Sequence, residues 1–348
     1  MGKKRVSVVM GGPSEEHDIS LLTGKEIISN MDKQRFVPKA VVLTDELMIY
    51  HSDFGYIPSD EELASPGDSD KFKGPVSFLN AESVFSDTEV AFPAMHGAFG
   101  EDGKIQGFLD ACRIPYTGSG VTGSAIGLNK FASLAIFSFM GLDIPPGIVV
   151  TKERFSPDLV FENLDMPVFV KCPQSGSSKL MGRAEDYKEL ESLIKELSNH
   201  TFHFIIEEEV MGEEYSCAVL EYPDGRVEAL PPARIIPEKS HFFDYEAKYT
   251  ENGAQEIVPA PCSQDLTEAI KDTAVKAHNA LDLSGISRTD MIHEDGILYV
   301  LETNSMPGLS KASIVPRCFR ALGRDFSDLI TILIDTAERK HHGNNTRN

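Results

Sequence analysis

The sequence predicts an α/β protein with largely buried sheets, because strand and helix patterns alternate along its 348 residues. A β-branched run at 6–10 ends in Gly11-Gly12 and is followed by a helical pattern at 17–31. Hydrophobic residues make up 41% of the chain and charged residues 25%, which is enough apolar material for real cores. The length predicts two or three packed units.

The chain carries a large excess of negative charge, with 54 Asp+Glu against 33 Lys+Arg and a net charge of −21. Binding to long nucleic acids or anionic membranes needs clustered Lys and Arg, so this balance argues against both. The five cysteines are scattered singly, which fits neither a disulfide framework nor a zinc site. No apolar run is long enough for a membrane span or a signal peptide, and we expect a cytoplasmic protein.

The expected elements follow in order from hydrophobic spacing. In residues 103–113 the apolar positions Ile105, Phe108, Leu109 and Cys112 fall at i, i+3, i+4 and i+7, one face of a helix. A longer helix, expected at 121–140, cannot continue past Pro145-Pro146. Strands are expected at 6–10, 37–43, 90–95, 168–171, 202–207, 215–220, 227–236 and up to about 291 and 301. Helices are expected at 17–31, 103–113, 121–140, 184–197 and 325–338, and a further helix carries Ile270, Ala274, Ala277 and Leu281. Residues 58–74 are expected to form an acidic surface excursion, and the polar tail is expected to be disordered.

One segment matches a dinucleotide-binding fingerprint without its context. Gly118-Ser-Gly120-Val-Thr-Gly123 reads G-x-G-x-x-G before a helix, and Asp143 follows twenty positions after the last glycine. A dinucleotide fold needs a buried strand that leads into the first glycine, whereas Pro115 interrupts the short segment here and Asp143 precedes the next strand. We interpret this segment as a tight turn.

Three oxygen-bearing side chains are expected to meet near the end of the chain. Glu302 and Asn304 are two apart on a strand and share a face, and Asp290 ends the neighbouring strand. Hard oxygen ligands of this kind suit Mg²⁺ held jointly with nucleotide phosphates. Taken alone, they can also be solvated acids on an acidic protein.

Other charged residues suit a nucleotide and an amino acid. Lys171 ends a strand just before the Gly/Ser loop at 174–178, whose backbone donors can fold over phosphate. Glu207 ends a strand in a geometry that suits an adenine edge, and the helix start after Gly11-Gly12 offers Glu16 to an ammonium group. Each position has an alternative interpretation as surface charge. Their joint order along the chain is harder to explain in that way; the further members of the set are Lys130, Lys248, Val210, Glu214 and Asp18.

At this point the chain resembles the D-alanine–D-alanine ligases of the ATP-grasp superfamily. The resemblance covers nearly the whole chain and is carried by colinear segments: Gly11-Gly-Pro-Ser-Glu-Glu16, His96-Gly-Ala-Phe-Gly-Glu-Asp-Gly103, Tyr116-Thr-Gly-Ser-Gly120, Leu128-Asn-Lys130, Gly176-Ser-Ser178, Phe243-Asp-Tyr-Glu-Ala-Lys-Tyr249, Arg288-Thr-Asp290 and Glu302-Thr-Asn-Ser-Met-Pro-Gly308.

The resemblance implies an ATP-grasp fold in which two α+β subdomains enclose the nucleotide beside an N-terminal Rossmann-like (pre-ATP-grasp) α/β domain. The expected units are 1–122, 123–212 and 213–340, followed by the polar tail 341–348. It also implies ATP, two Mg²⁺ ions with Mn²⁺ as an alternative, small-molecule substrates and a homodimer.

The resemblance assigns roles to individual residues. For ATP the implied residues are Lys130, Lys171, Ser178, Glu207, Val210, Glu214 and Lys248, and for the metal they are Asp290, Glu302 and Asn304. Glu16 would bind the ammonium of the first D-alanine, Arg288 and the Gly308 N–H would form the oxyanion site, and Ser177 and Tyr249 would link a closing loop to Glu16. His96 would lie in the substrate pocket, and Ser313 with the Ile314 backbone would receive the second carboxylate.

The implied reaction is the ATP-dependent joining of two D-alanine molecules through an acyl phosphate, for peptidoglycan synthesis. Tyr249 favours an amine as the second substrate. The alternatives are a related ligase with a different second substrate, such as D-lactate, and a non-catalytic nucleotide-binding module. Lys179 and Leu180 stand where the family has a small apolar residue and Gly, and Cys172 separates Lys171 from the expected Pro, so we expect altered nucleotide affinity.

Overall fold

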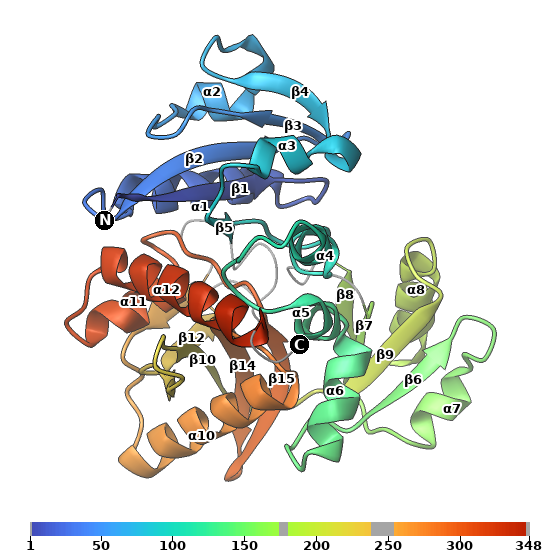
Figure 1. Cartoon of the computed structure of the whole chain (residues 1–348). Helices are drawn as coiled ribbons and strands as arrows, with labels where there is room; N and C mark the ends of the chain where they lie inside the picture. The colour runs from blue at the N-terminus through green and yellow to red at the C-terminus, as the bar shows by residue number, and fades with distance from the viewer. Residues whose placement is uncertain (1, 174–179, 238–253, 346–348) are drawn as a thin grey trace.

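The computed structural model of the chain describes residues 2–173, 180–237 and 254–345, and within these ranges the strands form three sheets (Figure 1). Each sheet has its own helices, and the three lobes surround a common centre. None of the described helices is long and apolar enough to cross a membrane.

The N-terminal sheet has the strand order β4-β3-β2-β1-β5. Its centre is parallel, because β1 pairs in parallel with β2 on one side and β5 on the other. Six consecutive residues of β1 are buried, as expected for a strand covered on both faces. The elements are β1 (Lys4–Gly11), α1 (His17–Asn30), β2 (Phe36–Leu43), β3 (Met48–His51), α2 (Asp60–Ala64), η1 (Pro66–Asp68), β4 (Lys73–Ser77), η2 (Phe78–Asn80), α3 (Glu82–Phe85), β5 (Val90–Pro93) and α4 (Lys104–Ala111).

The central lobe contains a four-stranded antiparallel sheet of order β6-β9-β7-β8. Helix α8 packs its apolar residues Leu190, Ile194 and Leu197 into the core of this sheet. The elements are α5 (Val121–Leu128), α6 (Lys130–Phe139), β6 (Gly147–Thr151), α7 (Pro157–Phe161), β7 (Val168–Lys171), β8 (Met181–Ala184), α8 (Tyr187–Leu197) and β9 (His203–Glu208).

The C-terminal sheet is antiparallel and has the order β13-β12-β10-β14-β15, with β11 pairing to β10. Helices α10 and α12 pack against it (Figure 1). The elements are β10 (Glu213–Glu221), β11 (Val227–Ala229), β12 (Ala233–Pro237), β13 (Ala254–Ile257), α10 (Gln264–Ala280), β14 (Ile286–Glu294), β15 (Ile297–Asn304), α11 (Ile314–Ala321) and α12 (Phe326–Asn345).

The cores show how the three lobes are joined. One continuous core contains Met10 and Ile27 of the N-terminal lobe together with Leu220, Phe319 and Leu333 of the C-terminal lobe. The central sheet has a separate core, and its lobe joins the rest through a smaller cluster that includes residues of α6 and β15. The N- and C-terminal lobes therefore form one packed body, to which the central lobe is attached.

Four expectations about the elements are wrong. Asp290 was expected to end its strand, but β14 continues to Glu294 and places Asp290 in its middle. The helix expected at 121–140 is two helices, because Asn129 adopts an extended conformation and its side chain caps α6 by accepting the Ala132 N–H at 3.2 Å. The strand expected at 227–236 is split into β11 and β12 around Pro231 and Pro232, which cannot donate ladder hydrogen bonds. The last helix continues to Asn345, into the tail that was expected to be disordered.

Candidate functional site

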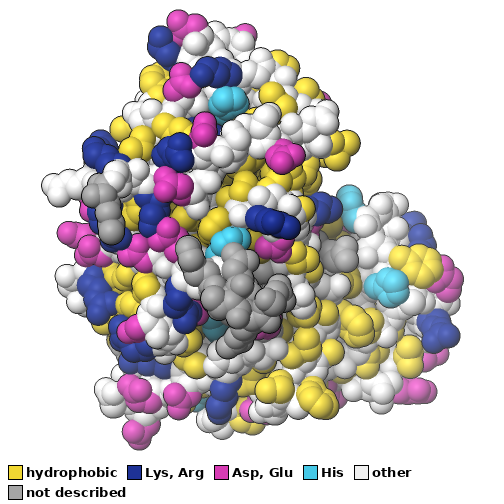
Figure 2. All heavy atoms as spheres, viewed as in Figure 1, with side chains coloured by type: hydrophobic (Ala, Val, Ile, Leu, Met, Phe, Trp, Pro, Cys, Tyr) yellow, Lys and Arg dark blue, Asp and Glu magenta, His cyan; other side chains and the backbone are white. Residues whose placement is uncertain are grey.

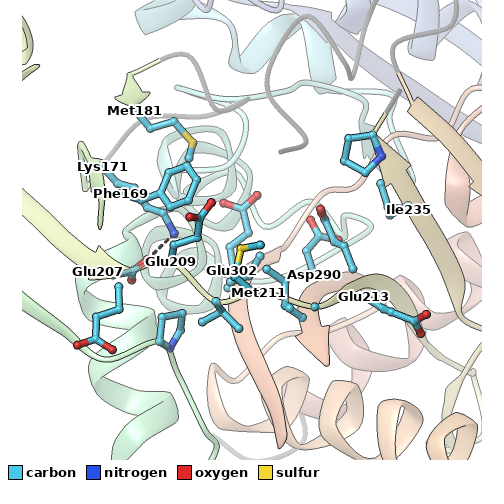
Figure 3. Close-up of a pocket in the computed structure, with 18 of the residues that line it drawn as sticks. Phe169, Lys171, Met181, Glu207, Glu209, Met211, Glu213, Ile235, Asp290 and Glu302 are labelled. Atoms are coloured by element: carbon cyan, nitrogen blue, oxygen red, sulfur yellow. Dashed lines mark hydrogen bonds and ion pairs between the residues drawn. The ribbon is translucent and has the colours of Figure 1, made fainter. Parts of the chain in front are cut away.

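A cavity of about 300 Å³ lies between the central and C-terminal sheets. Its walls come from β7 and β9 on one side and from β10, β12, β14 and β15 on the other, with Lys130 at the start of α6 (Figure 3). The residues predicted for the nucleotide that line it are Lys130, Lys171, Glu207, Val210, Glu214, Asp290 and Glu302. The three-lobed fold thus places charges from distant parts of the sequence around one cavity.

The two described lysines of the predicted phosphate site already pair with carboxylates. Phe169 is opposite Glu207 in the β7–β9 register, so Lys171, two residues on, shares its face and donates to the Glu207 carboxylate. Both partners are buried. Lys130 Nζ lies 2.8 Å from Glu302 Oε2. A phosphate group in the cavity would compete with these carboxylates for the same ammonium groups.

The three predicted metal ligands do converge. Asp290 and Glu302 are directly paired across β14 and β15, and Asn304 Nδ2 lies 3.4 Å from Asp290 Oδ2. Arg288 holds Asp290 in a bidentate contact, with Nε to Oδ1 at 2.8 Å and Nη2 to Oδ2 at 2.6 Å, and the Ser216 hydroxyl also bonds Asp290. Burial alone would lower the pKa of Arg288, but Asp290, together with Glu302 and Glu256, outweighs burial and raises this pKa.

The chain between β9 and β10 forms a charged wall of the cavity that sequence reasoning described only in part. Glu209 lines the cavity, and its carboxylate accepts two hydrogen bonds from Arg183 of β8, both at 2.8 Å. The strand β8 was not predicted, so the alternation that points Arg183 toward Glu209 was not visible. Apolar lining residues were missed as well: Phe169, Met181, Met211, Ile292 and Leu301.

The residues predicted for the first substrate lie together near the N-terminal lobe. Glu16, directly before α1, is 9% exposed, and a Cβ atom placed on Gly97 would lie 2.9 Å from its Oε2 atom. His96 Nε2 lies 3.0 Å from Thr23 Oγ1, and the Ser14 hydroxyl donates to the His96 carbonyl at 2.7 Å. Burial lowers the pKa of His96, against the opposing effect of Glu16.

The residues predicted for the second carboxylate also form one group. Ser313 stands at the N-terminus of α11, and its Oγ lies 2.8 Å from Ser310 Oγ. A Cβ atom on Gly308 would lie 2.9 Å from the same Ser313 oxygen. Backbone N–H groups at a helix N-terminus favour anions, so Ser313 and Ile314 stand where a carboxylate can be bound.

Four predicted residues, Ser177, Ser178, Lys248 and Tyr249, lie outside the described residues. The G-x-G-x-x-G segment lies within the described residues; it bends at 117–118, and its last three residues begin α5. Gly118 has φ 91°, a Cβ atom on Gly285 would lie 3.1 Å from the Gly118 N atom, and the Ser119 hydroxyl accepts the Ser284 N–H at 3.0 Å. The bend therefore packs on the C-terminal lobe.

Positive charge does not gather into one broad area on the visible described surface. Figure 2 shows Lys and Arg side chains interspersed with Asp and Glu over this face. On this face, the described residues form no continuous basic area.

Comparisons with known proteins agree with the geometry. The models of the N-terminus and the C-terminus of D-ala D-ala ligase match residues 5–119 and 136–335. A D-alanine–D-alanine ligase from Leptospira biflexa serovar Patoc is 34% identical over 96% of this chain and 99% of the relative, and one from Mycobacterium sp. (strain KMS) is 35% identical over 98% of each.

Comparison with solved structures also finds ligases of this kind. The VanG D-Ala:D-Ser ligase from Enterococcus faecalis has a TM-score of 0.84 at 28% identity and covers 97% of this chain and 100% of that chain. The D-alanine–D-alanine ligase from Bacillus anthracis complexed with ATP has a TM-score of 0.76 at 29% identity and covers 99% and 100%. This chain therefore belongs to the D-alanine–D-alanine ligase family.

Proposed function

We propose that this enzyme joins two D-alanine molecules into D-alanyl-D-alanine at the expense of ATP, which is converted to ADP and phosphate, and so supplies peptidoglycan synthesis. The observation that carries the proposal is the single cavity in which Lys130 and Lys171 face Asp290 and Glu302 across the two sheets. The ATP in the Bacillus anthracis relative supports the assignment of this cavity to the nucleotide.

The chemistry follows from the charges of the substrates. A carboxylate is a poor electrophile, so a carboxylate oxygen of the first D-alanine attacks the γ-phosphorus of ATP and ADP leaves. The amine of the second D-alanine then attacks the carbonyl carbon of the acyl phosphate, and inorganic phosphate leaves with the oxygen that came from the first carboxylate. Lys130 and Lys171 neutralise charge on the phosphates, and Arg288 with the Gly308 N–H stabilises the tetrahedral oxygen.

We propose that the nucleotide binds with its adenine beside Glu207 and Val210 and its ribose beside Glu214. Asp290, Glu302 and Asn304 fit two Mg²⁺ ions, since carboxylate and amide oxygens are hard ligands and the described site gathers two carboxylates, fewer than an all-protein metal cage. The ions would supply charge neutralisation at the phosphates, and Mn²⁺ could replace them.

The identity of the second substrate has one alternative that a comparison supports. The VanG relative is a D-Ala:D-Ser ligase, and its structure matches over 97% of this chain. Each pocket contact that distinguishes such substrates contributes about 1–3 kcal/mol, so two enzymes with the same fold can differ in their second substrate. A ligase with another second substrate, D-serine or D-lactate, is therefore the alternative. On the basis of the family resemblance, we also propose that the protein is cytoplasmic and that it forms a homodimer.

Phosphate release from ATP tests the proposal. We expect release that depends on D-alanine and on Mg²⁺, with one phosphate formed per D-alanyl-D-alanine. L-Alanine should give none. D-Alanine mixed with D-serine or D-lactate should give mainly D-alanyl-D-alanine. Phosphate release that does not depend on D-alanine would contradict the proposed function. An excess of the product that joins D-alanine to D-serine or D-lactate would favour the alternative second substrate.

A further inference from the structure

A buried carboxyl group beside the first-substrate residues has no role in the reaction described above. Glu101 lies in the loop between β5 and α4, five residues after His96, and is 8% exposed. Its Oε1 atom accepts the Gly97 N–H at 2.8 Å, and its own N–H donates to the Gly97 carbonyl at 2.8 Å. Glu101 therefore fixes, through two hydrogen bonds, the residue that follows His96.

Glu16 packs against the same glycine. Gly97 has φ 69°, in the region that favours glycine, and a Cβ atom there would lie 2.9 Å from Glu16 Oε2. The position of Gly97 thus sets how closely the Glu16 carboxylate approaches the loop. Two carboxyl groups, Glu16 and Glu101, are held around one short backbone segment.

The surroundings of Glu101 disfavour its charged form. Among the described residues, no Lys, Arg or His side chain lies within 4.0 Å of the Glu101 carboxyl group. Burial is the main cause that raises the pKa of Glu101, to about 8, and Glu16 and Glu302 raise it further, while the Gly97 hydrogen bond and Arg288 act in the opposite direction. His96, in the same loop, is a further titratable group nearby, and burial lowers its pKa.

We propose that Glu101 is a positioning residue that works as an uncharged carboxylic acid, holding Gly97 and His96 in place while the negative charge offered to the first substrate stays on Glu16. The proposal rests on the proposed function, because the bound group is the ammonium of the first amino acid. A second carboxylate at Glu101 would repel the Glu16 carboxylate and displace the loop. Activity should therefore fall at alkaline pH as Glu101 ionises.

Replacement by glutamine separates this role from that of a charged ligand. Glu101→Gln keeps an oxygen that accepts the Gly97 N–H and cannot ionise, whereas Glu101→Ala removes the acceptor. We expect Glu101→Ala to raise the KM for the first D-alanine about tenfold or more with little change in the KM for ATP, and Glu101→Gln to recover most of this loss. The matched control is Glu16→Gln, the same change on the neighbouring group, which should lower kcat/KM about a hundredfold.

The pH profile is the second readout. Between about pH 6 and about pH 10, the wild-type kcat/KM for D-alanine should decline through a group that titrates near pH 8, and Glu101→Gln should lack that step. If a folded Glu101→Gln enzyme is as impaired as Glu101→Ala, or keeps the same alkaline step, the proposal is wrong.

A stability measurement does not depend on the reaction. Folding raises the pKa of Glu101 from its ordinary 4.5 to about 8, so the protonated acid contributes stability that is complete below pH 4.5 and is lost as the pH rises through about 8. The melting temperature of Glu101→Gln relative to wild type should therefore increase across this window and level off above it. A constant difference would overturn the proposal even in a protein that showed no ligase activity, and failure of D-alanine-dependent phosphate release alone would overturn only the proposed function.

Discussion

The two ends of the site hold their charges in different ways. At the nucleotide end, the described cations that line the cavity are each paired with a carboxylate: Lys130 with Glu302, Lys171 with Glu207 and Arg234 with Glu213. At the first-substrate end, His96 and Glu101 are held by a hydroxyl group and a backbone N–H. The nucleotide end thus holds charge pairs that would exchange partners when phosphate arrives, whereas His96 and Glu101 are held by neutral groups and need no exchange.

This difference predicts two kinds of mutant. Removing a cation at the nucleotide end leaves a buried carboxylate without its partner, so both stability and ATP binding should suffer. Removing a neutral contact at the substrate end should change D-alanine binding with a smaller effect on stability.

Arg288→Ala should have the largest effect. The change removes the proposed oxyanion donor and leaves buried Asp290 without its bidentate partner. We expect kcat to fall about 10²–10³-fold and the free energy of unfolding to fall by about 3–5 kcal/mol. Steady-state kinetics and chemical denaturation measure both. Lys71→Ala, at the exposed pair with Asp70, is the control and should change neither; a largely active Arg288→Ala enzyme would contradict the assignment.

Lys171→Met should act through its buried partner. The substitution keeps most of the side-chain volume but leaves the Glu207 carboxylate buried beside an apolar group. We expect a loss of about 3 kcal/mol in stability and an ATP KM raised on the order of tenfold or more. The double variant Lys171→Met/Glu207→Gln should regain stability and remain poor in ATP binding. Stability that stays low in the double variant would argue against the pairing.

Arg183→Ala should loosen one wall of the nucleotide cavity without removing a contact to phosphate. Arg183 fixes Glu209 through two hydrogen bonds and also pairs with exposed Glu185. We expect the ATP KM to rise about fivefold with kcat nearly unchanged. Glu185→Ala is the matched control and should behave as wild type. Exchange of the charges in Arg183→Glu/Glu209→Arg should recover part of the loss, and a variant in which only kcat falls would contradict this role.

Leu180→Gly should have the smallest effect. Leu180 accepts the Cys172 N–H at 3.0 Å and packs partly against the core of the central lobe, next to the Gly/Ser loop. Glycine allows more backbone conformations than leucine and loses this packing. We therefore expect the dissociation constant of ATP to rise about threefold. Calorimetric titration checks the value. An unchanged dissociation constant would show that the departure from the family pattern at this position has no effect on the nucleotide.

Much of the fold could be predicted because its signals are local. The buried run of β1 and the spacing of α4 are visible in a few consecutive residues, and both elements lie where they were expected. The break at Asn129 was missed because a single cap outweighs a helical hydrophobic pattern on both sides of it. Family membership was predicted correctly from colinear motifs, and the boundaries of the three units near 122 and 212 stay predictions.

Part of the geometry of the candidate site could be predicted from the sequence, but its pairings could not, and the roles of its residues stay predictions. Glu302 and Asn304 were expected to share a face because of strand alternation, and Asp290 was expected on the neighbouring strand, where it does pair with Glu302. The contacts of Lys171 with Glu207 and of Arg183 with Glu209 depend on strand order in the central sheet, which no local pattern contains. The role of Glu101 depends on burial, which only the folded chain determines.

Transfer of oxygen from substrate to phosphate tests the proposed ligation most directly. D-Alanine labelled with ¹⁸O in its carboxylate would be turned over with unlabelled ATP and Mg²⁺, and the inorganic phosphate examined by ³¹P NMR or mass spectrometry. We expect one ¹⁸O atom in the phosphate for each dipeptide formed, because the attacking carboxylate oxygen leaves with the phosphate. Unlabelled phosphate would contradict an acyl-phosphate route and indicate hydrolysis of ATP by water instead.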